Sequence, residues 1–108
     1  MVRALLADRS AGAVGSALEL VEQLPAAGLP PAHVGVAAGP VVVQGGDYFG
    51  RTVNLAARIA AHAAAGQVLV SQRVAESGPP EGVRFVELGE LELKGLARPM
   101  RLLEVRRT

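Results

Sequence analysis

One segment of this sequence carries side chains suited to binding a phosphorylated ligand. Asn54 and Arg58 are four residues apart, so on a helix they project from one face in consecutive turns. The Arg58 guanidinium offers a planar fork of donors for phosphate oxygens, and the Asn54 carboxamide adds a neutral donor. Asp47, in the glycine-containing loop before this segment, can accept hydrogen bonds from an exocyclic amine. This spacing therefore indicates anion chemistry beside an amine-recognising carboxylate.

The same residues also have a purely structural interpretation. Asp47 can be a turn residue, Asn54 an exposed helix residue and Arg58 a solvated surface charge. Lys94 is the only lysine among 11 basic residues, and it can be either an exposed turn residue or a phosphate-binding cation. Spacing alone leaves both interpretations open.

The elements that must position these residues follow from hydrophobic periodicity and from the glycines and prolines. Helices are expected from Ala13 to a stop at Pro25, from Thr52 to Ala63 with an end at Gly66, and as a short turn over Gln72–Glu76. Strands are expected over Val2–Ala7, His33–Ala38, Val41–Val43, Gln67–Ser71, Val83–Leu93 and Leu102–Val105. Gly39-Pro40 is expected to make a hairpin-like turn between two of these strands, and residues 44–47 a flexible loop. The sum is an α/β or α+β fold, with helices packed on a sheet.

Composition excludes several classes of function. A net charge of +1 over 108 residues does not suit nonspecific nucleic-acid binding, and the absence of cysteine excludes disulfides and zinc-thiolate sites. The longest nearly apolar stretch, Val34–Val43, is interrupted by glycine and proline and is too short to span a bilayer. His33 and His62 alone do not make a metal site. A cytoplasmic location without a membrane segment is therefore expected.

The chain also resembles a known family. In Gly46–Arg58, Asp47 is followed seven residues later by Asn54 and four residues after that by Arg58, which is similar to the signature of class III adenylyl and guanylyl cyclase catalytic domains. The likeness extends in the family's order over His33–Gly39, Gly66–Ser71, Leu88–Gly95 and Pro99–Val105. No P-loop and no Gly-x-Gly-x-x-Gly stretch is present, which disfavours an unrelated phosphate-binding α/β domain that matches by accident.

The resemblance implies a ferredoxin-like α/β sandwich that pairs head to tail with itself or with a related cyclase domain. ATP then binds at the dimer interface and is converted to cyclic AMP and pyrophosphate. Asp47 matches the position that recognises the adenine amino group and favours ATP over GTP. Asn54 and Arg58 match the catalytic pair that positions the ribose and stabilises the phosphate charge. Lys94 matches the substrate-binding lysine of the terminal phosphates.

The family also requires Mg or Mn, held by two aspartates near the start of its domain. By the order of elements both aspartates would precede Met1, so residues 1–108 are expected to form a single, N-terminally truncated cyclase domain with no metal ligands. Whether it is an enzyme stays open: it can be a fragment of a competent adenylate cyclase, the metal-deficient half of a heterodimer, or a noncatalytic regulatory, dimerisation or nucleotide-sensing module. The isolated chain is expected to be catalytically inactive.

Overall fold

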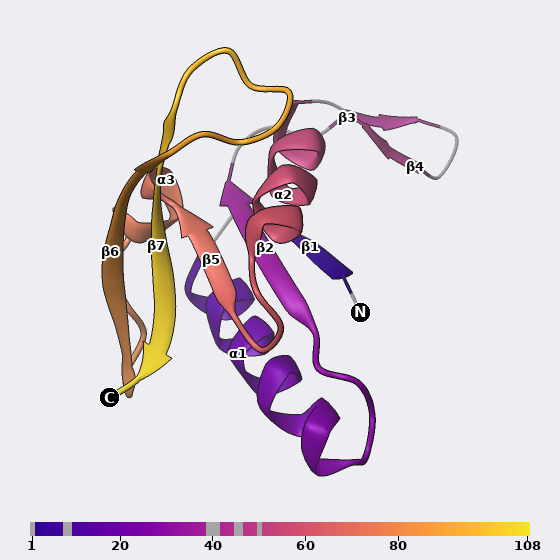
Figure 1. Ribbon diagram of the computed structural model, residues 1–108, viewed down its shortest axis with the longest axis vertical. Helices are drawn as coiled ribbons and strands as arrows, with labels where there is room; N and C mark the ends of the chain where they lie inside the picture. Colours follow the sequence, from indigo (N-terminus) through magenta and orange to yellow (C-terminus); the bar gives the residue numbers. More distant parts are fainter. Residues whose placement is uncertain (1, 8–9, 39–41, 45–46, 50) are drawn as a thin grey trace.

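The computed structural model describes residues 2–7, 10–38, 42–44, 47–49 and 51–108, and the side chains of residues 14–38, 52 and 54–108. Strands and helices alternate along most of the chain (Figure 1). In order they are β1 (Val2–Ala7), α1 (Ser10–Ala26), β2 (His33–Ala38), β3 (Val42–Gln44), β4 (Asp47–Phe49), α2 (Arg51–His62), β5 (Val68–Ser71), α3 (Gln72–Ala75), β6 (Val83–Leu91) and β7 (Met100–Arg107).

The main sheet has five strands in the order β1-β2-β5-β7-β6. The first three are parallel to one another, while β7 runs antiparallel to both β5 and β6. The long β6 and β7 form a hairpin whose connecting loop rises beside one end of α2 (Figure 1). β3 and β4 make a separate two-stranded sheet. The expected mixed α/β architecture is confirmed.

The sheet has one buried cluster on each face because strand side chains alternate. Val34 and Val36 of β2 pack in the cluster that holds the apolar residues of α1, together with Val68 and Val70 of β5. The intervening Leu69 packs on the other face, in the cluster that holds α2. Two helices thus lie on opposite faces of the same strands, and α2 is the one that carries Asn54 and Arg58.

A glycine sets how closely α2 approaches the sheet. Gly35 is buried in the middle of β2, and a Cβ placed on it would lie 2.5 Å from the Ala56 carbonyl oxygen and 2.9 Å from Ala60 Cα. Only a residue without a side chain allows backbone to meet backbone here. The start of β2 is also joined to α2 by a 2.6 Å hydrogen bond in which His33 Nδ1 donates to the Ala60 carbonyl.

The end of α1 differs from the sequence prediction. The helix continues through Pro25 to Ala26, so Pro25 is not the stop. Gly28 has a φ of +77°, and the amides of Gly28 and Leu29 donate to the carbonyls of Pro25 and Leu24, at 3.0 and 2.9 Å. This is the Schellman arrangement, in which a glycine of positive φ closes the helix. Pro25 stands next to the last helical residue, so the missing N–H bond and the local distortion it causes affect only the final turn.

The predicted hairpin between the strands around Gly39-Pro40 is wrong. β3 pairs with β4, with Gln44 opposite Asp47, and does not pair with β2. The reason is that β1 and β5 already occupy both edges of β2, which leaves no free backbone groups for β3. Gly39 and Pro40 themselves lie outside the described residues.

β4 was not predicted: Gln44 and Asp47, expected in a flexible loop, are paired residues of the two strands β3 and β4. The remaining elements agree with the sequence prediction to within a few residues, including the Thr52–Ala63 helix and the two closing strands. Ser71 caps α3 by accepting a 3.4 Å hydrogen bond from the Val74 amide. Among the described residues, no helix combines the length and the apolar character needed to cross a bilayer.

Candidate functional site

Asn54 and Arg58 of α2 lie on the face turned away from the sheet. Ala56, Ile59 and Ala60 are fully buried against the strands. Asn54 is exposed and Arg58 is half-buried, and both emerge on the opposite side of the helix. The helix has 3.6 residues per turn, so residues three or four positions apart share a face. The buried residues therefore lie on one face of α2, and Asn54 and Arg58 lie on the other.

Ala57 of α2 is exposed, whereas Ala56 and Ala60 are buried against the sheet. It lies three residues after Asn54, on the same face, and Ala61 follows four residues later. On this exposed face, the two short alanine side chains therefore leave open space beside the longer side chains of Asn54 and Arg58.

The loop between β6 and β7 brings Lys94 to this face. Leu93 is 4% exposed and packs in the same buried cluster as Ile59 of α2, which fixes the start of the loop against the helix. The chain then turns, with the Leu96 amide donating to the Leu93 carbonyl at 3.1 Å and Gly95 at a φ of +86°. Lys94, between Leu93 and Gly95, is exposed beside α2.

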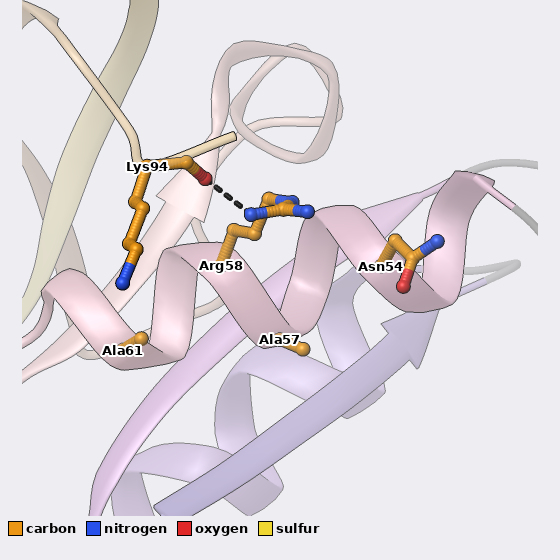
Figure 2. Close-up of a pocket in the computed structure, with 5 residues that line it drawn as sticks. All are labelled: Asn54, Ala57, Arg58, Ala61 and Lys94. Carbon is orange, nitrogen blue, oxygen red and sulfur yellow. Dashed lines mark hydrogen bonds between the residues drawn. The ribbon is translucent and has the colours of Figure 1, made fainter. Parts of the chain in front are cut away.

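Two neighbouring hollows share Asn54 and Arg58. The first, of about 300 Å³, is lined by Asn54, Ala57, Arg58, Ala61 and Lys94 (Figure 2). The second, of about 550 Å³, is lined by Asn54, Leu55, Arg58, Gly95, Leu96 and Ala97. The fold thus brings together three of the four predicted site residues, although Lys94 is 36 positions from Arg58 in the sequence.

Arg58 is held by the backbone of the loop. Its Nη1 donates a hydrogen bond to the carbonyl oxygen of Lys94, and the Lys94 side chain leaves in another direction, toward Ala61 (Figure 2). One residue therefore fixes the guanidinium through its carbonyl and places a second cation nearby through its side chain. Since a guanidinium has five N–H donors, others remain for a ligand.

The site has a positive charge excess. None of the described residues that line the two hollows is acidic. In the described part of the chain, the ion pairs lie elsewhere, between Arg101 and Glu87, Arg106 and Glu104, and Arg107 and Glu22. Among the described side chains, no carboxylate forms an ion pair with Arg58 or Lys94, which suits a polyanionic ligand.

Comparison with known proteins identifies the family. Residues 31–104 match the family described as the adenylate and guanylate cyclase catalytic domain. The chain belongs to this family. The matched range includes all of α2 and the loop that carries Lys94.

Similar proteins include one that is named as an adenylate cyclase. The chain is 39% identical over 82 residues to a pH-sensitive adenylate cyclase of Mycobacterium tuberculosis, a match that covers 72% of this chain and 21% of the relative. An uncharacterized protein of the same species is 40% identical over 73 residues, which cover 68% of this chain and 19% of that protein. The cyclase domain described here thus spans about a fifth of the length of these relatives.

Solved structures show the same fold. An adenylate/guanylate cyclase/hydrolase from Silicibacter pomeroyi matches with a TM-score of 0.53 and 33% identity, over 62% of this chain and 40% of that one. The adenylyl cyclase CyaB from P. aeruginosa matches with a TM-score of 0.53 and 28% identity, over 63% and 37% of the two chains. The predicted fold class, the ferredoxin-like nucleotide cyclase fold, is confirmed by these matches.

Asp47 remains a sequence prediction. It is the first residue of β4 and pairs with Gln44 of β3, but its side chain lies outside the described residues. β4 precedes α2 and contacts it, so the backbone of Asp47 belongs to the same region of the cyclase domain as Asn54.

The described residues include no counterpart of the metal-binding residues of the cyclase family. No group of three or more His, Asp or Glu side chains within them is arranged to hold a metal ion. The donors at the candidate site are an amide, a guanidinium and an ammonium, and the two cations repel a metal ion. These residues suit the phosphates of a nucleotide and do not suit its metal ions.

Sequence reasoning missed three contributors to the site of this cyclase domain, Ala57, Ala61 and Gly95. Ala57 and Ala61 could have been found from helical spacing, because they follow Asn54 at intervals of three and seven. The role of Gly95 could not, because it depends on a contact between Arg58 and a loop that is distant in the sequence.

Proposed function

We propose that this chain supplies the nucleotide-binding residues of a class III adenylate cyclase site, at an interface with a second cyclase domain. The observation that supports this most is the shared hollow of Asn54, Arg58 and Lys94, in a chain of the cyclase family. The ligand is ATP, and the reaction of the complete site forms cyclic AMP and pyrophosphate.

The proposed roles follow from the chemistry of the three side chains. The remaining N–H donors of Arg58 stabilise the charge that grows on the α-phosphate when the ribose 3′-oxygen attacks phosphorus. Asn54 supplies a neutral donor and acceptor that orients the ribose. Lys94, a compact charge on a flexible stem, neutralises the terminal phosphates. Pyrophosphate then leaves from the side that Lys94 occupies.

Asp47 completes the proposed set by recognising the base. A carboxylate accepts a hydrogen bond from the amino group of adenine and has no such donor to meet at the carbonyl of guanine. The proposed preference is therefore for ATP over GTP. Since the exposed hollow covers one side of a ligand only, a second cyclase domain would enclose the nucleotide in the dimer.

The 108-residue chain by itself is proposed to be catalytically inactive. Its sequence offers no match to the two metal-binding aspartates of the family, and Asp47 already matches the base-recognising position. The metal-binding residues would have to come from outside these 108 residues. A noncatalytic nucleotide-sensing or dimerisation module is the alternative role of the same site.

Binding tests the proposal directly. The chain is titrated with ATP, and the variants Arg58→Ala and Lys94→Ala are each expected to weaken ATP affinity by about tenfold or more, because each removes a charge-assisted phosphate contact. Arg73→Ala removes an exposed cation from α3, outside the hollow, and is expected to leave affinity unchanged. Equal losses from all three variants would indicate nonspecific charge attraction and contradict the proposal.

Two comparisons separate the parts of the proposal. Asp47→Ala is expected to weaken the binding of ATP without weakening the binding of inorganic triphosphate, since only the contact with the base is lost. Activity is then measured after mixing the chain with a metal-competent cyclase domain that lacks its own equivalent of Arg58. Cyclic AMP formation by the mixture, abolished by Arg58→Ala in this chain, supports the catalytic role. ATP binding without cyclic AMP formation supports the nucleotide-sensing module.

A further inference from the structure

We propose that Gly95 is a positioning residue for Arg58. The bare Cα of Gly95 and the preceding Lys94 carbonyl together form a seat that holds the guanidinium at the candidate site. The functional part of this inference rests on the proposed function, because it assumes that Arg58 binds phosphate. The contact itself does not depend on that assumption.

The steric observation is specific to this glycine. A Cβ built on Gly95 would lie 2.7 Å from Arg58 Nη2 and closer still to Nη1 and Cζ, whereas real Cβ atoms essentially never come within 3.0 Å of another group. Other glycines of positive φ, such as Gly82 and Gly66, have nothing within 4 Å of such a Cβ. Turn geometry alone therefore explains a glycine at those positions, while at Gly95 the guanidinium occupies the space as well.

The group that would move is Arg58 and not the backbone. The three nearest atoms all belong to the end of its flexible side chain. A methyl group at position 95 is therefore relieved by rotation of Arg58 out of its seat, with loss of the hydrogen bond to the Lys94 carbonyl. The consequence falls on the candidate site, and the packing of α2 against the sheet is left intact.

The seat also couples the two cations. The Lys94 carbonyl lies at the guanidinium, while the Lys94 side chain extends toward Ala61 (Figure 2). The carbonyl dipole offsets part of the repulsion between the two positive groups. The seat thus keeps the Arg58 side chain in place before phosphate binds. Binding then costs less conformational entropy, because the side chain is already ordered.

The first experiment observes Arg58 without any ligand. In nitrogen-15 spectra of the 108-residue chain at low temperature, a guanidinium held by a carbonyl shows two resolved Nη signals because its rotation is slow. We expect resolved Arg58 signals in the wild type and in Gly82→Ala, and a single averaged signal in Gly95→Ala. Gly82 is the matched control because it is an exposed turn glycine with a φ of +77°. An averaged signal in the wild type, or resolved signals in Gly95→Ala, would overturn the proposal.

The second experiment measures the affinity for inorganic triphosphate. Gly95→Ala is expected to weaken binding about tenfold, and to weaken it no further when Arg58→Ala is already present. Gly82→Ala is expected to lower the melting temperature as much as Gly95→Ala does, without changing affinity. An equal loss from Gly95→Ala in both backgrounds would overturn the positioning role. If the wild type binds no triphosphate, the proposed function fails, and the nitrogen-15 spectra still decide whether the seat exists.

Discussion

Replacing Gly35 by alanine is expected to separate α2 from the sheet. The added methyl group would meet the backbone of Ala56 and Ala60, with the Ala60 Cα only 2.9 Å away. Helix backbone cannot rotate aside as a side chain can. The helix must instead retreat from β2 by about 1 Å to restore ordinary van der Waals contact.

The size of the effect follows from where α2 lies. Overpacking of this kind costs about 1–3 kcal/mol, and the retreat also loosens the packing of the buried cluster that contains Ile59 and Leu69. We therefore expect a loss of about 2 kcal/mol, which lowers the urea midpoint by about 1 M for an m-value of about 2 kcal/mol/M. Because Lys94 lies on another element, the same shift also moves Asn54 and Arg58 relative to it.

The assay is urea unfolding followed by circular dichroism, with Gly15→Ala as the matched control. Gly15 lies inside α1, and a Cβ built there has nothing within 4 Å. The same chemical change is expected to stabilise the protein at Gly15 by about 0.5–1 kcal/mol, because alanine is the better helix former. An unchanged or raised urea midpoint for Gly35→Ala would refute the close approach of α2 and β2.

Two further predictions concern the remaining core and the surface. Leu102→Ala, at a fully buried position of β7, is expected to cost about 2–5 kcal/mol in urea unfolding, whereas Leu29→Ala, at a residue that is 50% exposed, should change stability by less than about 0.5 kcal/mol. Similar losses of stability in the two variants would contradict the assignment of Leu102 to the buried core. A hydrogen bond from Arg107 lowers the pKa of Glu22, and one from Arg106 lowers the pKa of Glu104, both from an ordinary value of 4.5. A carboxyl group whose pKa is lower in the folded than in the unfolded state stabilises the fold when the pH is above the unfolded-state pKa. The urea midpoint should therefore fall as the pH drops below about 4.5. The fall should be smaller in Arg107→Gln, and an identical pH profile there would argue against the Glu22 contribution.

The elements were predictable where local signals decide them. The apolar spacing of α1 and the strand patterns around Val34 and Leu69 are local, and the corresponding elements lie where periodicity places them. The helix of Asn54 and Arg58 was likewise predictable. One error came from competition between segments, because β3 had no free edge of β2 to join. The other was local, since Gly28 rather than Pro25 ends α1.

The candidate site divides in the same way. Asn54 and Arg58 share a helix face because four residues make just over one turn, so the sequence by itself determined that pair. The family resemblance supplied the interpretation of Lys94, but no local rule connects it to Arg58 across 36 positions. Only the tertiary structure decided that the Lys94 carbonyl and the bare Gly95 receive the guanidinium, because this contact arises when the β6–β7 loop packs against α2 through Leu93.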